Sequence, residues 1–342
     1  MATIELEQYL RNRADADEFS GVVRLTVGGD ERFTAAHGWA SHAWHVANDV
    51  DTRFDTASIT KLFTAVAALQ QVDAGAFDLD TSAIDYLGLA GTAISREVTV
   101  RHLLTHTSGI GDDADEEAGE VYEDLFRERP NYTIRETADF LPQFVHREPN
   151  FPPGTGCRYN NCGYVLVGLM FERATGLSYR DLVRRDIFER AGMIGAGFSS
   201  MDLVAEGVAE GADPVRDEVG AIVGWRRNIY SFPPIGSPDS GAVVTAADLE
   251  RFVRAVVGGR LLSPAMTSAF LTPQVDYRQE DGWTQRFGYG PWFRVEPDGD
   301  ALFLEKEGIN VGVSGMVRHY PARDLTVVIL SNLEDGAWEP IE

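Results

Sequence analysis

A serine and a lysine three residues apart are the first pair in the chain with the chemistry of a catalytic site. Ser58 and Lys61 stand at the start of a segment, 59–74, whose apolar residues recur at helical spacing. Residues i and i+3 share one face of a helix, so the amine can reach the hydroxyl. A neighbouring base activates such a hydroxyl, and a helix N-terminus stabilises developing negative charge. The alternative is an N-cap serine followed by a surface lysine.

The composition favours the chemical interpretation of Lys61. The 342 residues contain 30 Lys plus Arg, and Lys61 and Lys306 are the two lysines among them. A guanidinium does not release its proton in proteins, so arginine cannot act as a base in place of lysine. This argument is weaker for Lys306, where charge alone would be sufficient.

A second group lies in a turn-rich segment, 152–161, that runs into a predicted helix at 162–175. Ammonium groups beside Tyr159 would favour its ionisation, which suits a general base and acid. The amide of Asn161 can orient a substrate amide or the amine of Lys61. The alternative is a packed tyrosine next to an asparagine that caps the helix.

The third group is the tripeptide Lys306, Glu307 and Gly308, placed between predicted strands at 301–305 and 312–320. Lys306 can hold an anionic group or keep Tyr159 acidic. Gly308 would let a substrate approach the backbone closely. The alternative is a lysine that protects the edge of a sheet.

The elements that must position these groups are strands at both chain ends and helices between them. A hairpin is predicted over 21–39 around a Gly-Gly-Asp turn. The remaining segments are helices at 59–74, 162–175, 179–190 and 245–257, and strands at 285–295, 301–305, 312–320 and 325–331. The pattern predicts an α+β fold with an antiparallel sheet built from both chain ends and flanked by helices. We expect one catalytic unit over 1–342, with a sheet part at 1–75 and 235–342, a mainly helical part at 76–234, and a cleft between them.

The charge excludes several classes of partner. A formal charge of −23 without a basic segment argues against nucleic acid and anionic membranes. No apolar run approaches the roughly 18 residues that span a bilayer, and residues 1–7 lack the features of a secretion signal. These observations predict a cytoplasmic protein. The acidic, lysine-poor composition fits either a GC-rich genome or adaptation to high salt.

Other candidate sites have simpler explanations. His102 and His106 have the spacing of metal ligands on a helix, but no glutamate follows His102, and we expect no metal or other cofactor. Cys157 and Cys162 are predicted to be reduced structural thiols. The acidic run 112–117 is predicted to be a solvated loop. Most aromatic residues of 283–293 are expected in the sheet core, with one or two lining the cleft.

With these motifs in one order, the chain resembles the serine β-lactamase and penicillin-binding protein superfamily. The resemblance is closest to the branch of class C β-lactamases, D-alanyl carboxypeptidases and esterases, and it extends from about residue 20 to 335. Ser58 and Lys61 match the Ser-x-x-Lys motif, Tyr159 and Asn161 match Tyr-x-Asn, and 306–308 match Lys-Thr-Gly. The segment 98–109 is similar to a further hallmark of this branch.

The resemblance implies a β-lactamase/transpeptidase-like fold and a set of roles. Ser58 would form the acyl-enzyme, Lys61 and Tyr159 would shuttle the proton, and Asn161 would position the substrate. The backbone N–H groups of Ser58 and Ile309 would form the oxyanion hole. The substrates would be small esters, amides or β-lactams, and the oligomeric state is left open.

One departure from the family pattern bears on the substrate. Glu307 replaces the usual small residue, and its carboxylate would pair with Lys306 and repel a substrate carboxylate. We therefore expect an esterase or a D-amino-acid peptidase. The alternatives are a β-lactamase or D-alanyl-D-alanine carboxypeptidase, and a penicillin-binding-like protein with little turnover. Only ten residues follow Asn332, which leaves little room for the family's usual C-terminal helix.

Overall fold

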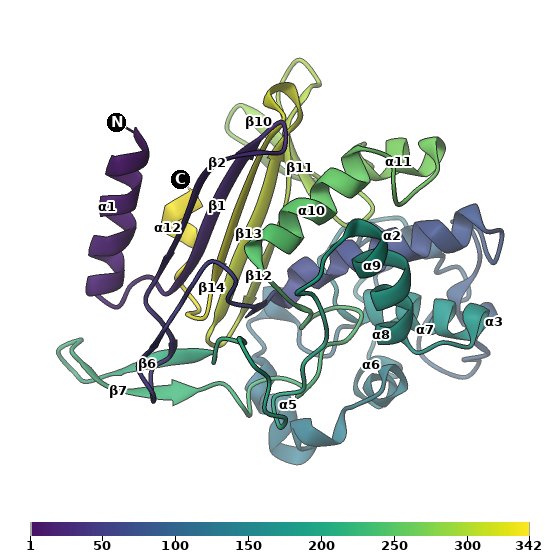
Figure 1. Ribbon diagram of the computed structural model, residues 1–342. Helices are drawn as coiled ribbons and strands as arrows, with labels where there is room; N and C mark the ends of the chain where they lie inside the picture. The colour runs from purple at the N-terminus through teal and green to yellow at the C-terminus, as the bar shows by residue number, and fades with distance from the viewer. Residues whose placement is uncertain (1, 342) are drawn as a thin grey trace.

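The computed structural model describes residues 2–341, with the side chains of Ala2 and Glu116 excepted. Its centre is an eight-stranded antiparallel sheet to which both ends of the chain contribute (Figure 1). The strand order is β2-β1-β14-β13-β12-β11-β10-β9. The predicted α+β architecture is confirmed.

The two ends of the chain meet near one edge of this sheet. β1 (Gly21–Val27) pairs with β2 (Asp30–His37) on one side and with β14 (Leu325–Ser331) on the other. The predicted N-terminal hairpin is therefore continuous with the C-terminal strands. The others are β13 (Val313–Tyr320), β12 (Ala301–Asn310), β11 (Trp292–Val295), β10 (Trp283–Phe287) and β9 (Val275–Glu280).

Two strand predictions are wrong in detail, and one strand was missed. The segment 285–295 is two strands, because residues 288–291 turn the chain back so that β10 pairs with β11. The strand predicted over 301–305 continues to Asn310, which places the Lys306 tripeptide inside a strand. β9 was not predicted, since it lies at the sheet edge and most of its side chains are exposed.

Helices cover both faces of the sheet (Figure 1). On one face lie α2 (Thr60–Asp73), α10 (Ala246–Val257) and α11 (Pro264–Phe270). On the other lie α1 (Ala2–Asp15) and α12 (Trp338–Ile341). The sequence did not predict α1, which contributes little more than Leu6 and Leu10 to the apolar cluster beneath it. α12 spans four residues.

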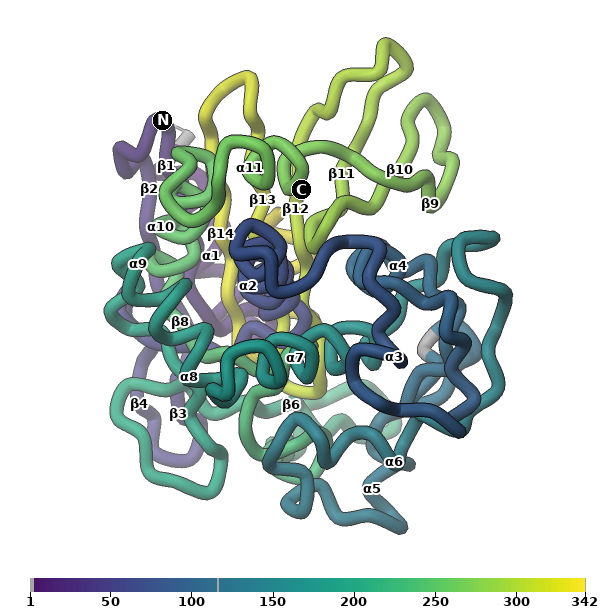
Figure 2. Tube along the Cα trace, turned by 90° about the vertical axis from the view of Figure 1, so that its right-hand side faces the viewer, coloured from purple at the N-terminus to yellow at the C-terminus, as the bar shows by residue number. Residues whose placement is uncertain are grey.

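The helical part gathers beside α2 and the sheet, with α3 to α6 grouped together in Figure 2. α7 (Cys162–Thr175) has the predicted bounds and ends at Gly176 in a left-handed conformation. The helix predicted over 179–190 is continuous but contains a π-helical segment at 184–188 between α8 (Tyr179–Val183) and α9 (Glu189–Ala191). The other elements are α3 (Ala83–Leu87), α4 (Val100–Leu104), α5 (Tyr122–Glu128), α6 (Leu141–Phe144), β6 (Ala212–Arg216) and β7 (Ile222–Arg227).

α2 is the central helix of the molecule. All ten residues from Thr60 to Leu69 are buried, polar and apolar alike. A helix that is buried on every side must be surrounded by other elements, and α2 packs against α7, α8 and α11. Within residues 2–341, no helix combines the length and apolar character needed to cross a bilayer. The division of the chain near residues 75 and 235 stays a prediction.

Candidate active site

Ser58 is presented by a tight turn between a short strand and α2. The strand β5 (Phe54–Asp55) pairs with β8 (Val243–Val244), and a 3-10 turn over Ala57–Ile59 follows it. Ala57 has a φ of 42°, a left-handed conformation that costs energy in a residue with a Cβ. The carboxylate of Asp55 accepts a 2.7 Å hydrogen bond from the Ala57 N–H and so stabilises this turn.

Lys61 is fully buried, one helical turn after Ser58. Its Nζ donates hydrogen bonds to Ser58 Oγ (3.0 Å), Asn161 Oδ1 (2.6 Å) and the carbonyl oxygen of Asp239 (2.8 Å). An ammonium group has three N–H donors and no acceptor, so three surrounding acceptors match the charged form. The prediction that the Lys61 amine reaches the Ser58 hydroxyl is correct.

Tyr159 contacts Ser58 from the loop that precedes α7. Its Oη donates a 2.8 Å hydrogen bond to Ser58 Oγ, although 101 residues separate the two in sequence. The ammonium nitrogens of Lys61 and Lys306 lie 5.1 and 5.0 Å from the centroid of the Tyr159 ring. Tyr159 therefore lies beside two positive charges, as the sequence predicted.

The ring of His106 packs on Tyr159, with centroids 4.7 Å apart. His106 Nδ1 accepts a 3.1 Å hydrogen bond from the backbone N–H of Asn160. Burial, together with the charges of Lys61 and Lys306, lowers the pKa of His106 well below its ordinary value, so the ring is neutral. His106 lies beyond the end of α4, whereas the Nδ1 of His102 accepts the N–H of Thr99 at the start of that helix. The two histidines therefore do not share a helix face.

The start of α7 is capped by a carboxylate that was predicted to lie in solvent. Asp112 is buried and accepts the backbone N–H groups of Asn161 (2.9 Å) and Cys162 (2.9 Å), as well as the amide Nδ2 of Asn161 (3.4 Å). Burial raises the pKa of Asp112 to about 6. Asp112, rather than the Asn161 side chain, thus caps α7, because the Asn161 amide is turned toward Lys61.

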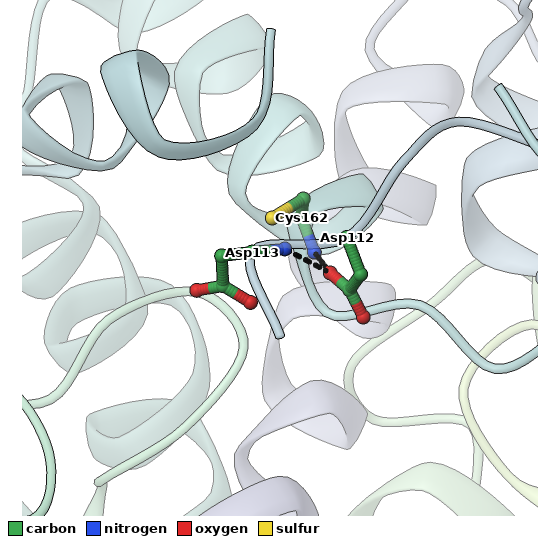
Figure 3. Close-up of side chains that lie close together, drawn as sticks. All are labelled: Asp112, Asp113 and Cys162. Carbon is green, nitrogen blue, oxygen red and sulfur yellow. Dashed lines mark hydrogen bonds between the residues drawn. The ribbon is translucent and has the colours of Figure 1, made fainter. Parts of the chain in front are cut away.

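The prediction of a solvated loop at 112–117 is therefore wrong for its first part. Asp112 and Asp113 are buried, Glu117 is exposed, and the side chain of Glu116 lies outside the described residues. The neighbours Ile110, Gly111 and Ala114 are buried too. This flanking apolar and small sequence was the available signal. Figure 3 shows Asp112, Asp113 and Cys162 together, with one ligand-type atom from each within 4.8 Å of the others.

Lys306 lies in β12, between β11 and β13, and is 1% exposed. The edge-lysine alternative is therefore wrong. Its Nζ donates a 3.2 Å hydrogen bond to Glu307, whose other oxygen accepts the indole N–H of Trp292. Burial acts to raise the pKa of Glu307, but Lys306 and Trp292 outweigh it and the pKa lies below its ordinary value.

Gly308 brings β12 against the turn that carries Ser58. A Cβ at this position would stand 2.2 Å from the carbonyl oxygen of Thr56 and 3.1 Å from the backbone nitrogen of Ser58. The lack of a side chain at Gly308 thus lets β12 lie against the protein backbone at Thr56 and Ser58, while the approach of a substrate stays a prediction. Ile309 follows directly and borders the same space as Ser58.

Two cavities meet at Ser58 and Ile309. The smaller has a volume of about 50 Å³ and is bordered by Asn161 and by the loop 232–241. The larger has a volume of about 380 Å³ and is lined by Tyr159 and Glu307. Phe287 and Trp292 also line it, as expected for one or two of the aromatic residues.

The two cysteines are free thiols. Burial raises the pKa of Cys157 to about 12 and that of Cys162 well above its ordinary value. A thiol must ionise to act as a nucleophile, so the raised pKa values disfavour that role, and the prediction of reduced thiols agrees with the structure.

Comparison with known proteins finds similar sequences and structures. A family model described as Beta-lactamase matches residues 6–341. A penicillin-binding protein 4 of Amycolatopsis lactamdurans is 29% identical over 86% of this chain and 77% of its own length. The esterase EstB of Burkholderia gladioli is 33% identical over 44% of this chain and 40% of its own length. The crystal structure of a penicillin-binding protein from Bacillus halodurans is 37% identical, with a TM-score of 0.88 over 96% of this chain and 97% of that one.

Proposed function

The chain belongs to the beta-lactamase family of serine hydrolases, and on that premise we propose that Ser58 is the nucleophile of an enzyme that hydrolyses small esters or amides, in the manner of an esterase or a D-amino-acid peptidase. The observation that carries the proposal is the convergence of the Tyr159 phenol and the Lys61 ammonium on Ser58 Oγ. Tyr159 Oη lies at 2.8 Å and Lys61 Nζ at 3.0 Å. Both distances are within the reach that direct proton transfer requires.

Tyr159 is the better candidate for the base. Lys61 is surrounded by three acceptors, which favours its charged form and leaves it without a lone pair for the serine proton. Tyr159 in its ionised form would accept that proton, and the ammonium groups of Lys61 and Lys306 beside its ring would stabilise the phenolate. Lys61 then acts by charge and by holding Asn161.

The reaction would proceed in two balanced steps. Ser58 Oγ attacks the substrate carbonyl, its proton passes through Tyr159 to the leaving alcohol or amine, and the ester bond of the acyl-enzyme forms as the substrate bond breaks. Water then attacks the acyl-enzyme, releases the acid and returns a proton to Ser58. The N–H groups of Ser58 and Ile309 would stabilise the oxyanion in both steps, at about 3 kcal/mol per donor.

Glu307 supports the preference for neutral substrates. Its carboxylate lines the larger cavity beside Ser58 and is paired with Lys306. A substrate carboxylate entering this cavity would meet a negative charge, and the ammonium that should attract it is already occupied. This argues against penicillins and peptidyl-D-alanine as good substrates.

Two alternatives remain to be compared by experiment. A β-lactamase or D-alanyl-D-alanine carboxypeptidase is one alternative. The other is a penicillin-binding-like protein with little turnover, which is favoured by the names of the relatives from Amycolatopsis lactamdurans and Bacillus halodurans. Physiological substrates would be small molecules in each case, and we propose that the protein acts in the cytoplasm.

Intact-mass measurement and turnover assays separate these functions. The protein is exposed to p-nitrophenyl butyrate and to a fluorescent penicillin, alongside a Ser58→Ala variant. We expect steady release of p-nitrophenol by the parent and neither turnover nor adduct in the variant. A stable penicillin adduct without ester turnover would support the binding alternative. Equal hydrolysis by the Ser58→Ala variant would refute Ser58 as the nucleophile.

A further inference from the structure

The smaller cavity at Ser58 contains two buried acidic side chains that the proposed reaction does not use. Asp113 and Asp239 are 5% and 8% exposed, and both line this cavity together with Ser58. None of the ion pairs found between described side chains involves either residue. Arg147 donates a hydrogen bond to the backbone carbonyl of Asp113, but its guanidinium pairs with Glu120. The two buried carboxylates thus lie beside the nucleophile without an ion pair to a described side chain.

Each carboxylate has one oxygen left for a ligand. Asp113 accepts a 2.9 Å hydrogen bond from the N–H of Ala114, and Asp239 accepts a 2.7 Å hydrogen bond from Ser237 Oγ. Among the described residues, no hydrogen bond reaches the second oxygen of either side chain. In Figure 3 the Asp113 carboxylate extends away from that of Asp112, which receives the hydrogen bonds drawn.

The environment of Asp113 favours a proton or a cation beside its carboxylate. Burial and the charges of Asp112 and Asp239 raise the pKa of Asp113 well above its ordinary value. A buried carboxylate is stabilised when a cation replaces that proton and hydrogen-bonds to it. The cavity therefore favours a ligand with a positively charged hydrogen-bond donor.

The position of the cavity limits where that charge lies in a substrate. The carbonyl oxygen of Asp239 accepts a 2.8 Å hydrogen bond from Lys61 Nζ, which in turn contacts Ser58 Oγ. Because Asp113 and Asp239 line the cavity that Ser58 borders, both residues lie near the site where the scissile carbonyl must bind. The remaining walls are mixed: Phe126, Phe140 and Phe232 supply apolar surface, and Asp55 and Asn161 are among the polar residues. A volume of about 50 Å³ suits an ammonium group and a small alkyl group rather than a long chain.

We propose that Asp113 and Asp239 form a subsite for the free amino group of an aminoacyl substrate, an amide or ester in which an ammonium and a small side chain are attached next to the scissile carbonyl. This inference rests on the proposed function, since it assumes that Ser58 attacks the carbonyl. It narrows the substrate class from esters and amides in general to those with an unblocked amino terminus.

The test compares two substrates that differ only in the amino group. Alanine p-nitroanilide, in both the D and the L form, carries the ammonium, and propionyl p-nitroanilide lacks it. kcat/KM is measured at pH 7 for the parent and for the Asp113→Asn and Asp239→Asn variants. Asp281→Asn, which removes the same charge from an exposed turn, is the matched control.

We expect the parent to prefer at least one alanine form over the propionyl substrate by about tenfold or more. Each of Asp113→Asn and Asp239→Asn should lower that ratio about tenfold, the scale of one hydrogen bond to a charged group. Asp281→Asn should keep the parent's ratio. A parent ratio of one or less for both alanine forms, or a ratio unchanged in both cavity variants, would overturn the subsite. Loss of activity on dialysis against EDTA would overturn it too, because the carboxylates would then hold a metal ion.

A binding measurement separates failure of the subsite from failure of the proposed function. In the Ser58→Ala variant, calorimetric titration compares alaninamide with propionamide. Binding of alaninamide about tenfold tighter than propionamide would support the subsite. If the parent also turned over none of the substrates, only the proposed hydrolase activity would be refuted. Equal binding of the two amides would refute the subsite while leaving ester turnover by Ser58 intact.

Discussion

Lys306 donates a 3.2 Å hydrogen bond to the carboxylate of Glu307, its neighbour in β12, at the border of the cavity that reaches Ser58. Successive residues of a strand usually point to opposite faces, yet the long lysine side chain allows its ammonium to meet the carboxylate. The family pattern has a small residue after this lysine, which leaves its charge available to a substrate. Here the charge of Lys306 is neutralised by Glu307 at the border of the larger cavity.

Replacing Glu307 by threonine, which restores the family's Lys-Thr-Gly pattern, should increase reactivity toward anionic substrates. The change removes a like charge and frees the Lys306 ammonium, so we expect the second-order rate of acylation by a fluorescent penicillin to rise about tenfold. The rate with p-nitrophenyl butyrate should change much less. Glu280→Gln, at an exposed position of β9, is the control for net charge. An unchanged penicillin rate would show that the ion pair does not set substrate choice.

Tyr159→Phe should lower the rate of acylation by about 10² to 10⁴, the usual contribution of a general base. The ring and its contacts with His106 are kept, and only the hydroxyl at 2.8 Å from Ser58 Oγ is removed. Stopped-flow measurement of the p-nitrophenol burst follows the acylation step directly. Tyr132→Phe, an exposed position, controls for loss of a phenol elsewhere. A burst of normal rate would exclude Tyr159 as the base.

Gly308→Ala should damage both stability and acylation. The added methyl group would lie 2.2 Å from the Thr56 carbonyl oxygen, so β12 must move away from the turn that carries Ser58. Overpacking of this kind costs about 1–3 kcal/mol, measurable by urea unfolding. Gly224→Ala is the matched control, since a Cβ there meets nothing within 4 Å and the backbone conformation is ordinary. Equal stability and activity of the two variants would contradict the close approach.

Asp55→Asn should change how stability depends on pH. Burial raises the pKa of Asp55 from 3.8 to about 6 in the folded state. Below 3.8 both states are protonated, and between about 4 and 6 the unfolded chain loses its proton first, so rising pH destabilises the parent relative to the variant. Asparagine keeps the oxygen that accepts the Ala57 N–H. We expect the variant to gain on the order of 2 kcal/mol relative to the parent between pH 3.5 and pH 7.5.

Urea unfolding at both pH values measures this difference, with Asp281→Asn as the control for an exposed carboxylate. A difference between Asp55→Asn and the parent that does not vary with pH would show that Asp55 ionises normally.

Much of the site was predictable because its parts are local patterns. Residues three apart lie on one face of any helix, so the spacing alone predicted the contact between Ser58 and Lys61. The helices α2 and α7 begin within one residue of their predicted starts. The scarcity of lysine identified Lys61 and Lys306 before any contact was known. The structure confirms that Tyr159 lies beside both ammonium groups.

Other features depended on contacts between distant segments. Asp112 and Asp113 occur in an acidic run, and the sequence pattern of such a run is the same whether it is solvated or buried. Their burial follows from the packing of this segment against the start of α7, where unpaired N–H groups of Asn161 and Cys162 require an acceptor.

The sequence by itself determined the candidate reactive groups, the sign of their charges and the contribution of both chain ends to one sheet. Only the tertiary structure decided that Gly308 meets the backbone at Ser58, that Lys306 is buried in an inner strand, and that Asp113 and Asp239 share a cavity. The physical reason is that residue type and spacing set local conformation and chemistry. Burial, by contrast, depends on which distant surfaces pack together, and burial is what turns a carboxylate from a solvated charge into a binding group.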